Sequence, residues 1–359
     1  MSTIDPVRTR PATMTQGTPA DVLPTDASDL LSEARAVVAP ALRLWVATLP
    51  YTIRRIANYH FDWTDHDGSP NSGGSWGKGL RAALVLACAR AVGGQTAAAV
   101  PAAAAVELVH NASLIQDDVF DQDTMRRHRP SVWAAYDPAA AVLVGDALFF
   151  SSIEALLSSP HSVPAIGTLI DVVKRLLAGE RADIEFESRR DVSLPECMAM
   201  TAAKTGALIE GACALGARYG EATPEQIGAL GSFGHHLGIA FQLVDDYLGI
   251  WGVEGVTGKP VLADLRRRKK SLPVVAALQA RTPAATELAS FYFDEGPMTD
   301  AQAMRAARLI EQTGAQDWVL AEGRTHAAKA LEKLVEARPT VEGKTQLAAL
   351  ARLVTDRCA

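Results

Sequence analysis

The chain has 359 residues, a formal net charge of −6, and 48% hydrophobic against 21% charged residues. This composition supplies a large core and excludes wholesale disorder, while the mild acidic excess argues against a general nucleic-acid binder. The four cysteines show no CxxC or CxxH spacing, so we expect no zinc site or disulfide framework, which fits a cytoplasmic protein. The sequence has no stretch of about 18 uninterrupted apolar residues, and its N-terminus lacks a basic start followed by an apolar run, so we expect neither a membrane span nor a signal peptide.

Residues 1–28 carry Thr, Pro, Ser, Gly and Asp without periodicity. We predict a disordered leader there, followed by one all-α domain over residues 29–359. From Asp29 onward Ala and Leu dominate and strand-like alternation is missing, which favours helices separated by turn residues. The Ala-rich segment 97–106 is expected to be a tightly packed core helix. Helices are predicted over 29–58, 79–93, 97–125, 139–157, 162–188, 195–218, 224–251, 271–280 and 300–357, the last broken near Pro339.

A glycine-rich segment containing Lys78 and Arg81 leads into the second predicted helix. Its glycines allow the backbone to approach a ligand, and a helix N-terminus favours an anion. The segment is no Walker loop, because GxxxxGK[ST] is absent. An ordinary flexible loop is the alternative.

The first acidic cluster follows an apolar helical stretch and contains Asp117, Asp118 and Asp121. On a helix, Asp117 and Asp121 share one face at i, i+4 spacing. Paired carboxylates at the end of an apolar helix suit a hard divalent cation such as Mg²⁺. A solvated acidic turn is the alternative for this cluster taken alone.

The second acidic cluster has the same layout, with Asp245 and Asp246 after an apolar stretch and Gly249 where a third Asp would match. Two such helices facing each other would bring at least five carboxylates around one pocket. Basic residues follow each cluster, which suggests a site where Mg²⁺ bridges carboxylates to substrate phosphates. These basic residues are Arg126 and Arg127 after the first cluster, and Lys259 and residues 266–270 after the second.

Together these segments resemble the trans-isoprenyl diphosphate synthase family (polyprenyl synthetases) over about residues 40–355. The matching motifs are GKGLR, ELVHNASLIQDDVFDQDTMRRHRPSVW, AAKTGALIEGA, FQLVDDYLG and VTGKPVLADLRRRKKSLP. The resemblance implies a single large helical bundle of the isoprenoid synthase type, with a central cavity flanked by two aspartate-rich helices. It is closest to actinobacterial-type geranylgeranyl diphosphate synthases, and it implies a homodimer.

The resemblance also implies roles for individual residues, together with about three Mg²⁺ ions and two substrates, isopentenyl diphosphate and an allylic diphosphate. The implied metal ligands are Asp117, Asp121 and Asp245. The implied isopentenyl diphosphate ligands are Lys78, Arg81, His110 and Arg127, and Arg126 contacts the allylic diphosphate. Lys204, Lys259 and Lys269 also bind substrate, and the Lys204 carbonyl, the Thr205 hydroxyl and the Gln242 amide stabilise the allylic cation.

Four positions depart from the family pattern: Gly79 replaces a basic residue, Ala82 a Pro, Gly249 the last Asp of the second cluster, and Arg268 a Gly. The Gly249 change leaves the direct ligand Asp245 in place. We interpret it as a subfamily feature and not as an inactivating lesion.

The expected product is geranylgeranyl diphosphate, with farnesyl or twenty-five-carbon diphosphates as alternatives. The growing chain should run toward the N-terminal end of the first aspartate-rich helix, where Ala112 lies about 7.5 Å from Asp117 along the axis. Related enzymes that stop at fifteen carbons have bulky aromatics near this position, whereas this chain has Ala112 and Ser113. Packing of Ala112 against a neighbouring helix is the alternative. Phe149 and Phe150 are candidates for a deeper floor of the pocket.

Three rival functions are less compatible with the sequence. A class I terpene cyclase usually has an Asn/Asp-x-x-Ser/Thr-x-x-x-Glu motif, which is absent at the second cluster. A non-catalytic partner subunit tends to lose the first aspartates, which this chain retains. A di-iron bundle needs two ExxH motifs, and only the one beginning at Glu107 is found.

Overall fold

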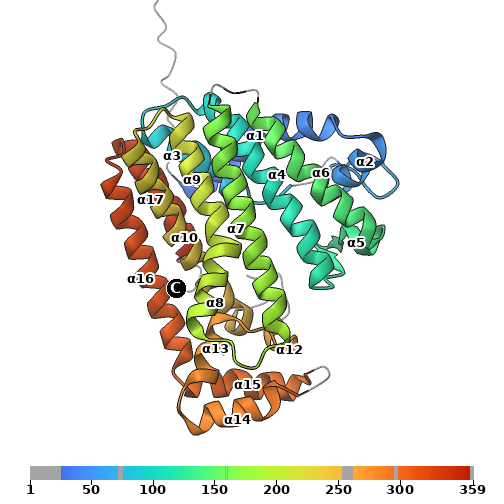
Figure 1. The fold of residues 1–359 in the computed structure, drawn as a ribbon, viewed down its shortest axis with the longest axis vertical. Coiled ribbons are helices and arrows are strands. Elements are labelled where there is room, and N and C mark those ends of the chain that lie inside the picture. Colours follow the sequence, from blue (N-terminus) through green and yellow to red (C-terminus); the bar gives the residue numbers. More distant parts are fainter. Residues whose placement is uncertain are drawn as a thin grey trace, which may run out of the picture.

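The computed structural model describes residues 26–71, 76–157, 159, 161–252, 262–294 and 298–355, and its regular structure is almost entirely helical (Figure 1). The all-α prediction is therefore confirmed. The first helices are α1 (Ala27–Ala47), α2 (Tyr51–His60), α3 (Leu80–Ala91), α4 (Thr96–Phe120), α5 (Val132–Ala135), α6 (Pro138–Leu157) and α7 (Ser162–Ser188). They are followed by α8 (Leu194–Thr201), the π-helix η1 (Ala202–Gly206), α9 (Ala207–Tyr219) and α10 (Pro224–Trp251). The last are α12 (Ala263–Arg266), α13 (Leu272–Gln279), α14 (Pro283–Tyr292), α15 (Asp300–Gln312), α16 (Ala315–Glu336) and α17 (Val341–Thr355).

The bounds of α7 and α10 agree with the prediction, but several other predicted segments are interrupted. Segment 29–58 is two helices, because extended backbone at Pro50 separates α1 from α2. Segment 97–125 ends at Phe120, since the antiparallel strands β1 (Met125–Arg126) and β2 (Arg129–Pro130) follow it. Segment 195–218 contains η1, and segment 300–357 breaks at Gly314, whose φ of +81° is left-handed, as well as near Pro339.

The chain also forms three short helices that the sequence pattern did not indicate, α5, α12 and α14. At the start, α1 begins at Ala27, because the Asp26 side chain accepts a hydrogen bond from the Ser28 amide at 2.8 Å and caps the helix. Helix α1 therefore begins just before the end of the predicted leader, and residues 1–25, the rest of that segment, lie outside the described residues.

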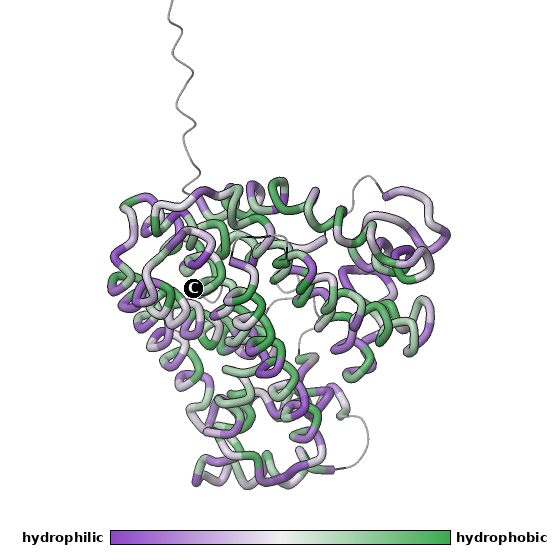
Figure 2. The backbone as a smooth tube through the Cα atoms, turned by 45° about the horizontal axis from the view of Figure 1, so that its top comes forward, coloured by the Kyte–Doolittle hydropathy of each residue, from purple (hydrophilic) through white to green (hydrophobic). Residues whose placement is uncertain are grey.

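The long helices run side by side, and α14 and α15 lie across the lower end of the bundle (Figure 1). Hydrophobic residues recur along each long helix between hydrophilic ones (Figure 2). The largest hydrophobic cluster joins α1, α3, α4, α6, α9 and α17. Helix α4 lies in this cluster, with Ala102, Ala103, Ala104 and Ala105 fully buried, which confirms the predicted core helix and places its acidic C-terminal end at the edge of the core.

Two helices, α4 and α6, are long and apolar enough to cross a membrane by length and composition alone. The burial of α4 inside the bundle accounts for its apolar residues, because a core helix passes the same test. Helix α6 is less buried, and its outer face carries Leu143, Phe150 and Leu157, each more than half exposed.

A histidine pair joins α10 to α16, with Nδ1 of His236 lying 3.2 Å from Nδ1 of His326. One ring must accept the proton that the other donates, so the pair is stable only when at least one ring is neutral. Burial, and then the charge of the other ring and of nearby lysines, lowers the pKa of His236 to about 4. Burial and the nearby Lys329 lower the pKa of His326 to about 4, although Glu322 lies 3.4 Å from its Nε2.

Because both histidine pKa values are lowered in the folded state, the stability that the pair contributes is present above pH 6.5 and lost as the pH falls toward 4. We expect this pair to remove roughly 1–3 kcal/mol from the free energy of unfolding across that window. Urea unfolding at several pH values measures this loss. The His236→Gln variant should show a flatter pH dependence, while His128→Gln, at an exposed hairpin position, should follow the wild type. Identical pH profiles for all three proteins would contradict this account.

Candidate active site

Lys204 lies among three carboxylates at the centre of the site. Its Nζ donates hydrogen bonds to Asp117 Oδ1 at 2.9 Å, Glu180 Oε1 at 3.1 Å and Asp183 Oδ2 at 2.8 Å. Burial alone would lower the pKa of Lys204, but these carboxylates outweigh it and hold that pKa above its usual range. Burial also raises the pKa of Glu180 to about 7, against the opposing charge of Lys204. Three carboxylates from α4 and α7 therefore hold the ammonium group of Lys204.

The π-helix η1 positions Lys204 and Thr205. A π turn is wider than an α turn and commonly occurs at functional sites. Helix α7 approaches this turn closely at Gly179, where a Cβ would overlap the Lys204 amide nitrogen. On the other side, the Thr205 hydroxyl donates to Gln242 Oε1 at 2.8 Å. The structure thus brings Lys204, Thr205 and Gln242 together at one point between α7 and α10.

The second residue of each Asp-Asp pair binds the protein itself. Asp118 is fully buried and accepts a hydrogen bond from Arg126 Nε at 2.9 Å. Asp246 is also buried and accepts from Gln242 Nε2 at 2.7 Å and from the Leu272 amide at 2.9 Å. Burial raises the pKa of Asp246 to about 7. The expectation that at least five carboxylates from these clusters surround the pocket is therefore wrong, because two of the five are structural anchors.

The remaining aspartates of the clusters are Asp117, Asp121 and Asp245. Asp117 contacts Lys204, and its Oδ2 lies 3.8 Å from Arg126 Nη2. In the part of the chain that the structure describes, the carboxylates of Asp121 and Asp245 have no hydrogen bond or ion pair to a side chain. Burial, and then the charge of Asp117, raises the pKa of Asp121. Carboxylate oxygens that have no side-chain partner suit a hard cation.

Gly249 lies one helical turn beyond Asp245 on the same face of α10. A Cβ at this position would overlap the Oδ2 atom of Asp264. The Asp264 carboxylate therefore fills the space that the side chain of a third aspartate would occupy. Among the described residues it has no side-chain hydrogen bond or ion pair.

A basic group lies beside α4, near the buried carboxylate of Glu107. Arg81 Nη1 lies 3.1 Å from His110 Nε2, and Arg127 Nη2 donates to Asn111 Oδ1 at 3.2 Å. Burial, and then the charges of Arg81 and Arg127, lowers the pKa of His110 well below its usual value, so the ring is neutral. His60 joins this group through Asn111 Oδ1 at 3.0 Å. Lys78 is exposed on the preceding loop, next to Gly79, whose φ of +72° is left-handed.

The segment after α12 brings further cations to the acidic cluster. Lys269 Nζ lies 3.9 Å from Asp183 Oδ2, and Arg267 forms an ion pair with Asp123, just beyond α4. Arg268 stands in place of the family glycine with a left-handed φ of +55°, and its guanidinium donates to the Phe291 carbonyl. Lys259 lies outside the described residues.

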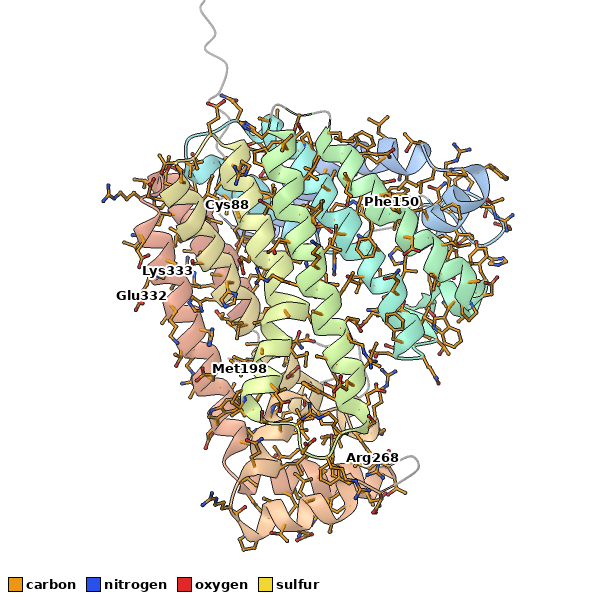
Figure 3. All side chains as sticks on the ribbon, viewed as in Figure 1. Cys88, Phe150, Met198, Arg268, Glu332 and Lys333 are labelled. Atoms are coloured by element: carbon orange, nitrogen blue, oxygen red, sulfur yellow. The ribbon has the colours of Figure 1, made fainter. Side chains whose placement is uncertain are left out.

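The residues expected to set product length lie on α4, but one expectation about the facing helix is wrong. Ala112 is fully buried, and the half-buried Ser113 donates from its hydroxyl to the His110 carbonyl at 2.8 Å. Phe150 is 71% exposed on the outer face of α6 (Figure 3), so it does not form a pocket floor. Phe149 packs partly buried against the main core.

The sequence analysis missed four residues of these two groups: Glu180, Asp183, His60 and Asn111. Glu180 and Asp183 have i, i+3 spacing on one face of α7, immediately after Gly179. This pattern, two acidic residues on one helix face directly after a glycine, could have identified Glu180 and Asp183 from the sequence. His60 and Asn111 carried no comparable pattern, because the contact between them joins segments distant in sequence.

Comparisons with known proteins agree with this geometry. The family described as polyprenyl synthetase matches residues 72–310. A (2E,6E)-farnesyl diphosphate synthase of Mycobacterium tuberculosis is 40% identical over 333 residues, covering 91% of this chain and 92% of the relative. A geranylgeranyl diphosphate synthase of the same organism is 41% identical over 331 residues, covering 91% and 93%.

Solved structures give the same result. A polyprenyl synthetase from Streptomyces coelicolor has a TM-score of 0.88 at 40% identity, covering 92% of this chain and 99% of that structure. A geranylgeranyl pyrophosphate synthase from Corynebacterium glutamicum, complexed with isoprenyl diphosphate and magnesium, has a TM-score of 0.77 at 26% identity, covering 92% and 99%.

Proposed function

Since the chain belongs to the polyprenyl synthetase family, we propose that it joins isopentenyl diphosphate to an allylic diphosphate in a Mg²⁺-dependent reaction, with geranylgeranyl diphosphate as its main product. The observation that supports this most is the presence of two groups suited to phosphate in one fold. The acidic cluster around Lys204 suits a metal-bound diphosphate, and the group around Arg81 and Arg127 suits a second diphosphate held directly by cations.

The carboxylates of Asp117, Asp121 and Asp245 fit Mg²⁺, because they are hard oxygen ligands and Asp121 and Asp245 have no side-chain partner among the described residues. When bound, about three Mg²⁺ ions would supply Lewis-acid stabilisation of the leaving diphosphate. Lys204 and Arg126 already contact this cluster and would bind diphosphate oxygens. Lys269 and Lys259 would do so from the segment after α10.

In the proposed reaction the allylic C–O bond breaks and its electron pair leaves with diphosphate. The double bond of isopentenyl diphosphate attacks the allylic cation, and the proton lost from the adduct passes to the released diphosphate. The Lys204 carbonyl, the Thr205 hydroxyl and the Gln242 amide present dipoles that stabilise the cation without capturing it. The hydrogen bond of Thr205 to Gln242, and of Gln242 to Asp246, holds these dipoles in position.

Isopentenyl diphosphate would bind at Lys78, Arg81, His110 and Arg127. The lowered pKa of His110 keeps its ring neutral, so this side chain would donate one hydrogen bond without adding charge. The two arginines supply the positive charge, and Asn111 fixes the Arg127 guanidinium.

The relatives carry both farnesyl and geranylgeranyl names at nearly equal identity, so the preference for twenty carbons rests on the small residues Ala112 and Ser113. A farnesyl or twenty-five-carbon diphosphate synthase is the alternative within the family. A terpene cyclase would not need the basic group around Arg81, and a non-catalytic subunit would not need the acidic cluster.

Product analysis tests the function. Incubation with isopentenyl diphosphate, Mg²⁺ and dimethylallyl, geranyl or farnesyl diphosphate should give geranylgeranyl diphosphate by mass spectrometry. Asp117→Ala should reduce turnover roughly a hundredfold or more, because it removes a ligand from a multi-metal site. A cyclic hydrocarbon product, or near wild-type turnover in Asp117→Ala, would contradict the assignment.

The product length should change when the α4 side of the pocket is filled. In Ala112→Phe the aromatic ring would occupy the space into which the chain grows, so the main product should shorten to fifteen carbons or fewer while turnover persists. Ala98→Phe, on an exposed position of the same helix, is the control and should leave the products unchanged. A folded, active Ala112→Phe enzyme with wild-type products would show that Ala112 does not limit the chain.

Asp264 should supply the carboxylate that Gly249 lacks. Its Oδ2 lies where a side chain at position 249 would lie, and that position is about 6 Å from Asp245, one turn away on the same helix face. Mn²⁺ binding in the presence of inorganic diphosphate, followed by electron paramagnetic resonance, tests this directly. Asp264→Asn should weaken Mn²⁺ binding about tenfold, which is the loss expected for one charged contact to the ion or its water ligands.

A rescue variant distinguishes this role from simple packing. Moving the carboxylate from one position to the other, in Gly249→Asp with Asp264→Ala, should restore Mn²⁺ binding. Asp300→Asn is the matched control, because Asp300 pairs with Arg266 of α12 at 2.8 Å and lies outside the cluster. Unchanged Mn²⁺ binding in Asp264→Asn would remove Asp264 from the metal site and leave the proposed reaction untouched.

The proposal includes a homodimer in the cytoplasm. Leu143, Phe150 and Leu157 repeat every seven residues and are 56%, 71% and 60% exposed, forming an apolar stripe along α6. Such a stripe suits the same helix of a second copy. Analytical ultracentrifugation should give a dimer for the wild type and a monomer for Phe150→Glu. A monomeric wild type, or a dimeric Phe150→Glu, would contradict assembly through this stripe.

A further inference from the structure

A cavity of about 150 Å³ lies between the loop after α7, the start and one face of α13, and the end of α14. None of its lining residues belongs to the metal, substrate or product-length positions discussed above. Its polar lining consists of the cations Arg189, Arg190 and Lys270, the carboxylate Asp191 and the amide Gln279. Its apolar lining includes Val275, Leu278 and Phe293.

Two of these cations have no acidic partner. Lys270 is only 8% exposed, yet its Nζ donates to a backbone carbonyl, that of Glu187, at 2.6 Å. Arg190 Nη2 likewise donates to the Phe293 carbonyl at 3.2 Å. Among the described residues no carboxylate forms an ion pair with either side chain. A buried lysine is normally paired with an acid, whereas here both cations have backbone carbonyls as their hydrogen-bond partners.

The other acidic groups near the cavity form no ion pair with Arg190 or Lys270 among the described residues. Arg189 pairs with two of them, with Asp191 Oδ1 at 3.0 Å and Glu196 Oε1 at 2.8 Å. The ring of Phe293 lies 5.7 Å from the Arg190 guanidinium and 5.9 Å from Lys270 Nζ, which stabilises both cations only weakly. Burial, and then the positive charges of Arg190 and Arg268, outweighs the attraction of Glu187 and lowers the pKa of Lys270.

We propose that this cavity is a second anion site, which binds a diphosphate group between Arg190 and Lys270 and takes a short apolar tail against Val275, Leu278 and Phe293. Diphosphate is the anion of choice because two neighbouring cations match its two phosphoryl groups. This choice rests on the proposed function, in which the enzyme releases inorganic diphosphate and handles prenyl diphosphates. Released inorganic diphosphate and the prenyl diphosphates present the same diphosphate group to the cavity.

The cavity is linked to the active site by the residue next to Lys270. Lys269 faces Asp183, its carbonyl accepts a hydrogen bond from Tyr292 at 2.7 Å, and the Leu272 amide is held by Asp246. An anion bound at Lys270 would restrain this short segment and so the position of Lys269. The expected effect is inhibition that excess allylic substrate does not relieve.

Calorimetric titration of the full chain in EDTA tests the site, because EDTA removes the metal-dependent binding of diphosphate. Inorganic diphosphate and isopentenyl diphosphate are titrated separately. The wild type should bind one equivalent of diphosphate at the isopentenyl site and one more at the cavity. Arg190→Glu should weaken the second event at least tenfold, because it reverses the charge of one cation. Arg190 is exposed, so this variant should fold.

Arg181→Glu, an exposed arginine on α7, is the matched control and should bind both equivalents. Lys270→Met is the second variant and should also lose the second event. A second event with both anions in the wild type would show that the head group suffices, and a second event with isopentenyl diphosphate alone would show that the apolar wall is needed. A single equivalent of each anion in the wild type, or a second event that is unchanged in Arg190→Glu, would overturn the proposal. The product assay of the wild type reports separately on the proposed reaction.

Discussion

Carboxylates that lie close together in a partly buried site need positive charge beside them, and in this protein Lys204 supplies its centre, with Arg126 and Lys269 nearby. One ammonium group contacts Asp117 from α4 and Glu180 and Asp183 from α7. The π-helix that carries Lys204 lies between α7 and α10, and a side chain at Gly179 would prevent that approach. Lys204 thus joins η1 to the two long helices α4 and α7 through one ammonium group and three carboxylates, and this contact is also the centre of the proposed chemistry.

In both Asp-Asp pairs the two aspartates have different roles. In each pair the second aspartate is buried and binds protein groups: Asp118 holds Arg126 near Asp117, and Asp246 holds Gln242 and the start of α13. The first aspartate of each pair does not bind these groups: Asp117 contacts Lys204, and Asp245 has no side-chain partner among the described residues. Adjacent residues on a helix point about 100° apart, so a pair can serve the fold with one side chain and a metal with the other.

Much of this organisation could be predicted from sequence. The Ala-rich periodic segments indicate helices, and the acidic and basic motifs indicate the two charged groups of the candidate site, because charged residues after apolar helices need an explanation beyond solvation. The rest depends on tertiary contacts. Spacing on α7 hints at Glu180 and Asp183, but only the fold shows that they face Lys204. Phe150 was misplaced because apolar residues on α6 suggest burial until packing shows which face is outward. The interruption at η1 also has no local sequence signature, since Ala202 and Ala203 are good α-helix formers.

In the proposed reaction, Lys204 and a divalent metal compete for the same carboxylates, and diphosphate relieves the competition by binding both. Calorimetry of Mg²⁺ binding to the wild type and to Lys204→Met, each with and without inorganic diphosphate, tests this claim most directly. The account predicts that the wild type binds Mg²⁺ much more tightly when diphosphate is present, whereas Lys204→Met binds Mg²⁺ more tightly than the wild type in its absence. Equal or weaker Mg²⁺ binding by Lys204→Met without diphosphate would contradict it.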